Sequence, residues 1–319
     1  MSDIRSQGQM SKIDLNYDGE FGTELQLVIP YAYYLFTQGL LGKTTSCLDT
    51  KSLYYFSKEH QEKYQGRRYV GADDPFKKNI PNKTEHVFKL NTSKWLPTPY
   101  KKQFANERFI FKREPLVIFN KYNSEWGGQA YNYLSLEVLE KIINLLKDRY
   151  QLIYCRPQEQ DIVIDQNAIL AFGDFDLLNR FPEVITIQKL HQDNPDLTFN
   201  TLQLMVFANC NKFISVKGGC SVLASYFGGT NIIYSVGGRE SMHGDYNNYA
   251  LYGGAHICPC FTYNELLRSI SAIYAAKQPL LSSGATLRIL SFIQFFKYNI
   301  GVLVHQLKIG IKKLIGIIK

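Results

Sequence analysis

The sequence predicts an α/β protein built on parallel sheet, followed by a basic amphipathic helix. From residue 113 to 277, short runs rich in Val and Ile alternate with segments of helical spacing. That alternation, across short loops, is typical of parallel strands joined by crossover helices. From Leu287 onward, apolar residues recur at helical spacing beside lysines. We therefore expect three segments, 1–112, 113–277 and 278–319.

The composition is globular and argues against a nucleic-acid-binding body. The 319 residues are 45% apolar and 14% aromatic, which does not indicate disorder. Six of the 36 basic residues lie in 280–319, where there is no acidic residue, so the first 279 residues hold 30 basic and 28 acidic side chains. The net charge of +8 therefore belongs mainly to the last segment, and we expect no nucleic-acid partner.

The start of the chain and the cysteines bear on location and metals. Residues 1–21 are polar and do not read as a secretory signal. The six cysteines are scattered, and the close pair Cys258-Pro-Cys260 lacks a second pair or a nearby set of histidines. We expect reduced thiols, a cytoplasmic location, and neither metal nor cofactor.

Individual elements can be placed from periodicity. Residues 24–39 read as a helix closed by Gly39, whereas 46–112 read as loops with short strands. Strands are expected at 115–122, 151–157, 183–188, 212–216 and 231–236, and helices at 135–150, 198–210, 221–228 and 262–277. Because parallel strands end at one edge, the loops after Phe119, Tyr154, Val216 and Val236 should share one rim, where ligands of such sheets bind.

At this rim, Lys217-Gly218-Gly219 lies where a strand passes into a helix. Glycines allow close approach of a ligand, and the amides of Gly219, Cys220 and Ser221 would begin a helix whose dipole favours anions. Lys217 adds a full positive charge. The pattern suits a diphosphate, although a turn needed only for tight packing explains the glycines equally well.

The segment "KGGCSVLASYFGGTNIIYS" resembles the donor site of GT-B-fold glycosyltransferases, particularly heptosyltransferases. These read Asp-Ser/Thr-Gly-x-x-His-x-Ala-x-x-x-Gly. Gly219, Ala224 and Gly228 keep the pattern, while Lys217 replaces the Asp and Val222 replaces the His.

Upstream, "DGEFGTELQLVIPYAYYL" resembles the glycine loop of fucosyltransferases of this fold, with Thr23-Glu24 in place of Asn-Gln. Residues 15–275 are also similar to a group of polysaccharide-biosynthesis transferases. These resemblances imply a GT-B-like architecture, with two Rossmann-like domains facing a cleft that holds a nucleotide sugar.

Further donor-binding candidates follow other strands. Asn120 and Lys121 follow the first central strand, and Arg156 ends the second, where it could grip a phosphate or form a surface salt bridge. The loop 237–249 supplies three further candidates, Arg239, Glu240 and His243.

The acceptor hydroxyl needs a general base. Glu24 is the first candidate and Asp18 the second, both in or beside the glycine loop; Glu20, His60 and Asp49 are weaker ones. Glu24 could instead serve only to complement a helix dipole.

An Asp-x-Asp pattern at Asp174 and Asp176 matches the metal signature of the other major glycosyltransferase fold. Since a match of three residues is common by chance, we expect a simple helix cap there.

The last segment predicts a helix with a continuous apolar face. Lys297 and Lys308 lie largely opposite that face, and Lys312 and Lys313 add further charge. Charges recur too often for a membrane span, so a helix lying on an anionic membrane is favoured. The alternative is a helix docked on the amino-terminal domain.

Together these features predict a metal-independent glycosyltransferase on the cytoplasmic face of a membrane. It would transfer a sugar from a nucleotide-sugar donor to a lipid-linked polysaccharide or oligosaccharide. Two alternatives stay open: a polysaccharide pyruvyltransferase of the same fold, and a non-catalytic, membrane-bound nucleotide-sugar-binding subunit.

Overall fold

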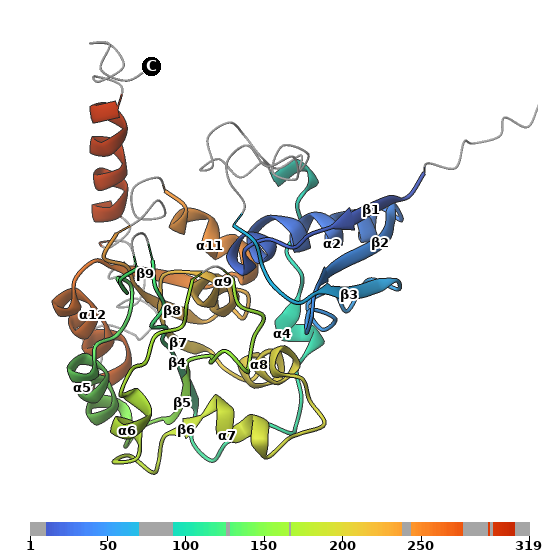
Figure 1. Ribbon diagram of the computed structural model, residues 1–319. Helices are drawn as coiled ribbons and strands as arrows, with labels where there is room; N and C mark the ends of the chain where they lie inside the picture. The colour runs from blue at the N-terminus through green and yellow to red at the C-terminus, as the bar shows by residue number, and fades with distance from the viewer. Residues whose placement is uncertain are drawn as a thin grey trace, which may run out of the picture.

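The computed structural model describes residues 11–69, 92–125, 128–165, 167–237, 244–276, 293 and 296–309. In these residues two parallel sheets, one of three strands and one of six, are covered by helices (Figure 1). The predicted α/β class is confirmed, because every strand pair in both sheets is parallel.

The smaller sheet has the order β1-β2-β3. Its strands are β1 (Ile13–Asn16), β2 (Leu41–Cys47) and β3 (His60–Tyr64). Between β1 and β2 the chain forms α1 (Phe21–Thr23), the π-helical η1 (Glu24–Val28) and α2 (Ile29–Thr37). Gly39 follows with φ of +72°, as expected for a residue that ends a helix.

The π-helical turn frees two carbonyls that other segments satisfy. The Tyr226 hydroxyl donates to the Leu25 carbonyl at 2.5 Å, and the Trp95 indole N–H donates to the Gln26 carbonyl at 2.8 Å. The irregular turn is therefore held by contacts from distant parts of the chain.

The larger sheet has the order β6-β5-β4-β7-β8-β9. Its strands are β4 (Pro115–Phe119), β5 (Gln151–Cys155), β6 (Ile185–Thr186), β7 (Lys212–Val216), β8 (Thr230–Tyr234) and β9 (His256–Cys260). The short β9 was not predicted; it contains Cys258 and Cys260. Pro259 is tolerated there because β9 is an edge strand.

Side chains of β4 alternate between two apolar cores. Val117 packs into the first core and Ile118 into the second. The first is covered by α7 (Ile187–Gln192), α8 (Phe199–Ala208), α9 (Gly219–Ser225) and α11 (Tyr246–Gly253). The second is covered by α5 (Leu136–Leu146), α6 (Asp174–Leu178), α12 (Tyr263–Ile270) and η3 (Ser271–Ala275) (Figure 1). Helices thus cover both faces of the sheet, as the alternating sequence pattern predicted.

The first core continues into the amino-terminal lobe. Leu25, Ile29 and Trp95 belong to the same buried cluster as Phe207 and Tyr226. The lobes are linked along the chain by η2 (Thr92–Lys94) and α4 (Tyr100–Gln103). The expected division near residue 112 is therefore not accompanied by a break in the core.

A C-terminal helix over 296–309, red in Figure 1, extends from the body. Tyr298 and Val302 are buried, and the Tyr298 ring lies 5.5 Å from Tyr246 and 6.0 Å from Phe261. The helix thus docks at the start of α11, in the carboxyl-terminal lobe. Among the described residues, no helix is long and apolar enough to cross a membrane.

Candidate anion-binding site

The turn after β7 lies at the carboxyl edge of the larger sheet. Gly218 has φ of +130°, a conformation that residues with a side chain rarely adopt. A Cβ built on Gly218 would lie 3.4 Å from the Lys121 ammonium. The turn and the end of β4 therefore bring a half-buried glycine backbone and a cation together, as the shared rim predicted.

Gly219 is needed for a different reason. A Cβ there would lie 2.8 Å from Cδ1 of Phe21 and 3.3 Å from the Gly22 nitrogen. The glycine loop of the amino-terminal lobe thus packs directly on the turn. The space on the Cβ side of Gly219 is filled by this loop, so close packing explains why a glycine is needed there, and only the Gly219 amide can face a ligand.

The amides of the turn differ in whether they already donate to a carbonyl. The amide and the hydroxyl of Ser221 both donate to the Gly218 carbonyl, at 3.1 and 2.8 Å. Ser221 therefore does not offer a free donor, contrary to the sequence expectation. In the described part of the chain, the amides of Gly219 and Cys220 have no carbonyl acceptor. Burial raises the pKa of the Cys220 thiol to about 11, which keeps it protonated.

Lys217 and Lys121 flank this turn. Lys217 is buried, and its amide donates to the Tyr234 carbonyl at 2.9 Å. The Lys121 ammonium lies 2.6 Å from a carboxylate oxygen of Glu125. Glu125 was not among the candidates predicted from the sequence, because residues 121–125 are not helical and four-residue spacing regularly brings charges together only on a helix.

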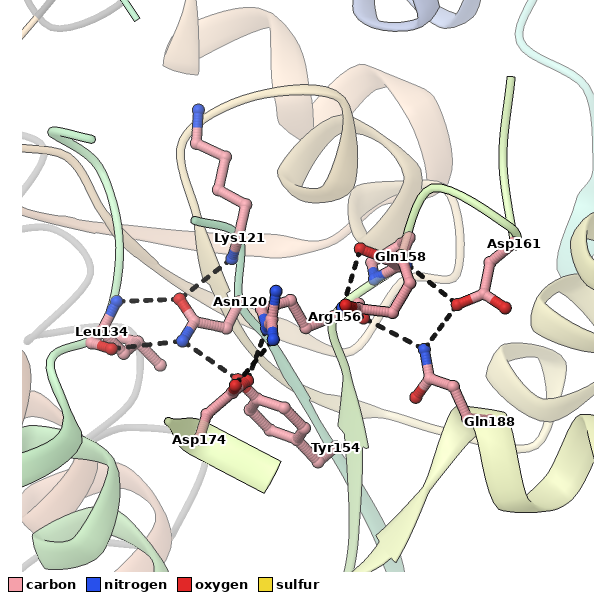
Figure 2. A network of polar contacts seen from close by, with 10 residues as sticks. Asn120, Lys121, Leu134, Tyr154, Arg156, Gln158, Asp161, Asp174 and Gln188 are labelled. Atoms are coloured by element: carbon pink, nitrogen blue, oxygen red, sulfur yellow. Dashed lines mark hydrogen bonds and ion pairs between the residues drawn. The ribbon is translucent and has the colours of Figure 1, made fainter. Parts of the chain in front are cut away.

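Arg156 is fixed below the rim (Figure 2). Its Nε and Nη2 donate to the two carboxylate oxygens of Asp174 at 2.5 and 2.7 Å, and Tyr154 donates to the same carboxylate at 2.6 Å. Arg156 and Asp174 are both buried, so neither a surface salt bridge nor a simple helix cap describes them. Asp174 does begin α6, but its carboxylate forms an ion pair with Arg156.

One nitrogen of the Arg156 guanidinium takes no part in the pair with Asp174. In the residues that the structure describes, Nη1 is buried and has no hydrogen-bond partner. The rings of Phe175 and Phe172 lie 5.0 and 5.9 Å from the guanidinium carbon. The guanidinium therefore keeps the two N–H donors of Nη1, while Asp174 neutralises its charge.

The Asn120 side chain organises the rim instead of facing it. Its oxygen accepts from the amides of Lys121 and Leu134 at 2.9 and 2.8 Å. Its nitrogen donates to the Leu134 carbonyl and to the Tyr154 hydroxyl, both at 3.1 Å. Its hydrogen-bonding capacity is thus used, and Figure 2 shows Lys121 extending away from this network.

The first candidate base, Glu24, is fully buried. One of its oxygens accepts hydrogen bonds from Ser46 and, at 2.9 Å, from Tyr54. The other lies 2.8 Å from Nη1 of Arg67, which also donates to the Gly19 carbonyl at 2.7 Å. Burial, reinforced by Glu24, raises the pKa of Tyr54 well above its ordinary value. Glu24 therefore holds the glycine loop in place and does not reach solvent.

Asp18 is more accessible. Its side chain is 29% exposed, and its carboxylate lies 2.6 Å from Nε of Arg68. By contrast, the Asp49 carboxylate accepts the Asn200 amide at 2.8 Å. His60 contacts Thr44 and Thr50 and stacks on Tyr54 with centroids 4.6 Å apart. Asp49 and His60 thus have packing partners of their own.

Arg239, Glu240, His243, Lys312 and Lys313 lie outside the described residues. Across the part of the chain that is described, no group of three or more His, Cys, Asp or Glu side chains is arranged to hold a metal ion.

Comparisons with known proteins give limited information. No family model and no curated protein matches the sequence. The ADP-heptose LPS heptosyltransferase II of E. coli has a TM-score of 0.48 at 8% identity, covering 82% of this chain and 98% of its own. A family 9 glycosyltransferase of Veillonella parvula has a TM-score of 0.45 at 11% identity, covering 88% of this chain and 97% of its own. With both scores below 0.5, these two similarities do not identify a family or a reaction.

Proposed function

We propose that this protein transfers a glycosyl group from a nucleotide-sugar donor to a glycan acceptor. The observation that carries the proposal is the half-buried Gly218 turn beside the Lys121 ammonium, directly opposite the amino-terminal glycine loop. A diphosphate fits this place because free backbone amides and a lysine favour anions. The resemblances of both glycine segments to glycosyltransferases point the same way.

The chemistry requires a stabilised leaving group. As an acceptor oxygen bonds to the anomeric carbon, the bond from that carbon to the diphosphate oxygen breaks and negative charge grows on the diphosphate. In our proposal, the amides of Gly219 and Cys220 and the ammonium groups of Lys121 and Lys217 stabilise this charge. A bound metal is not part of the proposal.

The acceptor proton must go to a base. Both carboxylates have an arginine partner, but Glu24 is fully buried, so we assign this role to the second candidate, Asp18, which is 29% exposed beside the glycine loop. In this assignment Glu24 is a positioning residue that fixes the loop through Arg67. A subunit that binds nucleotide sugars without turnover is one alternative, since the buried Glu24 carboxylate cannot act as the base. A polysaccharide pyruvyltransferase is the other, and consumption of phosphoenolpyruvate would distinguish it.

The test begins with nucleoside diphosphates and a panel of nucleotide sugars, measured by calorimetry. Lys121→Gln should weaken nucleoside-diphosphate binding about tenfold, because a charge-assisted contact is lost. Lys141→Gln is the matched control, since Lys141 forms the same four-residue spaced pair with Glu137 on α5. Equal affinities for the two variants would contradict the phosphate assignment.

Turnover separates the enzyme from the binding subunit. The nucleotide sugar that binds most tightly should release nucleoside diphosphate in the presence of wild-type protein, and Asp18→Asn should slow that release. Binding without release, for both proteins, would favour the non-catalytic alternative.

We further propose that the acceptor is lipid-linked and that the C-terminal helix lies on the membrane. Its exposed side carries large apolar side chains at a spacing of three and four residues: Phe296, Ile300, Leu303, Val304 and Leu307. Lys297 and Lys308 are exposed on the same helix. An apolar stripe with lysines suits an anionic lipid surface, and docking through Tyr298 and Val302 leaves Ile300, Leu303, Val304 and Leu307 exposed.

Sedimentation with vesicles rich in phosphatidylglycerol tests this part. The double variant Leu303→Gln, Leu307→Gln should lose vesicle binding, whereas Leu145→Gln, at an exposed leucine of α5, should retain it. Equal sedimentation of both variants and the wild-type protein would contradict the membrane assignment.

A further inference from the structure

We infer that Glu125 forms an ion pair with Lys121 while the site is empty. Once a bound diphosphate pairs with Lys121 instead, Glu125 accepts a hydrogen bond from a hydroxyl group of the donor. Glu125 would then determine donor specificity as well as position the lysine. This inference rests on the proposed function and deepens it.

The first support is the position of the ammonium group. Lys121 Nζ lies 2.6 Å from Oε1 of Glu125 and 3.4 Å from the position of a Cβ on Gly218. The side chains of Lys121 and Glu125 are 22% and 11% exposed. One ammonium group thus pairs with a carboxylate beside the Gly218 turn, where the proposed diphosphate would bind.

The second support is the contrast with Arg156. Asp174 binds Arg156 through two hydrogen bonds in a buried setting. A ligand that replaced Asp174 as the partner of Arg156 would leave the buried Asp174 carboxylate without a counter-ion. Lys121 has one carboxylate partner at a partly exposed place. A diphosphate carries more negative charge than one carboxylate, so it can displace Glu125 from Lys121 without opening the core.

The third support concerns the carboxylate itself. Within the described chain, Oε1 of Glu125 is buried and lacks a hydrogen bond of good geometry. Its other oxygen accepts from Asn132 at 3.3 Å, and Asn132 in turn accepts the Val236 amide at 3.0 Å. Asn132 therefore links Glu125 to the segment after β8, on the side of the rim next to β7.

The release of Lys121 has a chemical consequence. A poorly hydrated carboxylate that loses its ammonium partner is unfavourable unless new hydrogen-bond donors approach it. The donors nearest to a bound diphosphate in a nucleotide sugar are the hydroxyl groups of the ribose and of the sugar. Glu125 is placed to accept from one of them.

The experiment uses the full chain, inorganic pyrophosphate, and the nucleotide sugar that binds wild-type protein most tightly. By calorimetry, Glu125→Gln should bind pyrophosphate about three- to tenfold more tightly, because the competing carboxylate is removed. Its preference for the nucleotide sugar over pyrophosphate should fall by about the same factor, because the hydroxyl acceptor is weaker. Glu137→Gln, which breaks the matched Lys141 pair on α5, should change neither value.

Two further variants keep the outcome interpretable. In the double variant Lys121→Gln, Glu125→Gln the gain in pyrophosphate affinity should vanish, and Glu125→Asp should lie between wild type and Glu125→Gln. Unchanged or weaker pyrophosphate binding by a folded Glu125→Gln protein would overturn the inference while leaving the proposed function intact. Failure of wild-type protein to bind pyrophosphate or any nucleotide would overturn both.

Discussion

The rim of the larger sheet has a rigid side and an open side. At the end of β5, Arg156, Asp174, Tyr154 and Asn120 form a buried network in which nearly every polar atom has a partner (Figure 2). Between β4 and β7, a half-buried glycine turn faces a lysine that has one partly exposed carboxylate partner. The difference shows that a charged residue at a strand end can serve the fold or a ligand, and that burial decides which.

The largest effect is expected on the rigid side. Asp174→Ala leaves the buried Arg156 guanidinium without its counter-ion, which should lower the free energy of unfolding by about 3–5 kcal/mol. Denaturant unfolding measures this change. Asp196→Ala removes a bidentate partner from exposed Arg108 and should have little effect. Similar losses of unfolding free energy for Asp174→Ala and Asp196→Ala would contradict a rigid network around Arg156.

A moderate effect is expected where the lobes touch. Gly219→Ala places a methyl group 2.8 Å from the Phe21 ring and should lower the free energy of unfolding by about 1–3 kcal/mol. Gly237→Ala meets open space and should stay within about 0.5 kcal/mol of wild type. If Gly219→Ala had the same free energy of unfolding as wild type, the glycine loop would have to be able to move away from the turn. The contact between the lobes would then belong with the open side of the rim.

On the open side, the effect should fall on binding and not on stability. Lys121→Gln should leave the midpoint of thermal unfolding close to that of wild type, because Lys121 is 22% exposed and the Gln amide can still donate a hydrogen bond to Glu125. The same protein should show the weaker nucleoside-diphosphate binding described above. A large loss of stability would place Lys121 with the rigid network.

The smallest effect concerns pH. Burial lowers the pKa of His60 below 6.5, so the folded protein holds this side chain neutral where the unfolded chain takes up a proton. The stability that His60 contributes is therefore complete above pH 6.5 and is lost as the pH falls below it. Unfolding measured on both sides of this pH should show a smaller decrease for His60→Gln than for wild type. Equal decreases would exclude His60 as the cause.

Much of the fold could be predicted from local pattern. The strands β4, β5, β7 and β8 and the helices α5 and α8 follow from alternating apolar runs and from caps such as Ser135, whose hydroxyl oxygen accepts the Val138 amide. The prediction missed β1 and most of β2, and it expected short strands within 46–112 without placing β3, because these side chains are mostly polar or half-exposed and show no clear alternation. It also missed β9, where a Cys-Pro-Cys sequence does not look like a strand.

The candidate site could be predicted only in outline. By itself the sequence determined that Gly218, Lys121 and Arg156 meet at one rim, because parallel strands with short connections bring their carboxyl ends together. Only the tertiary structure decided that Arg156 and Glu24 are enclosed by Asp174 and Arg67, and that Phe21 fills the space at Gly219. The reason is physical: the positions of strands and helices along the chain follow from local pattern, whereas the partner of each charge depends on which distant side chains pack beside it.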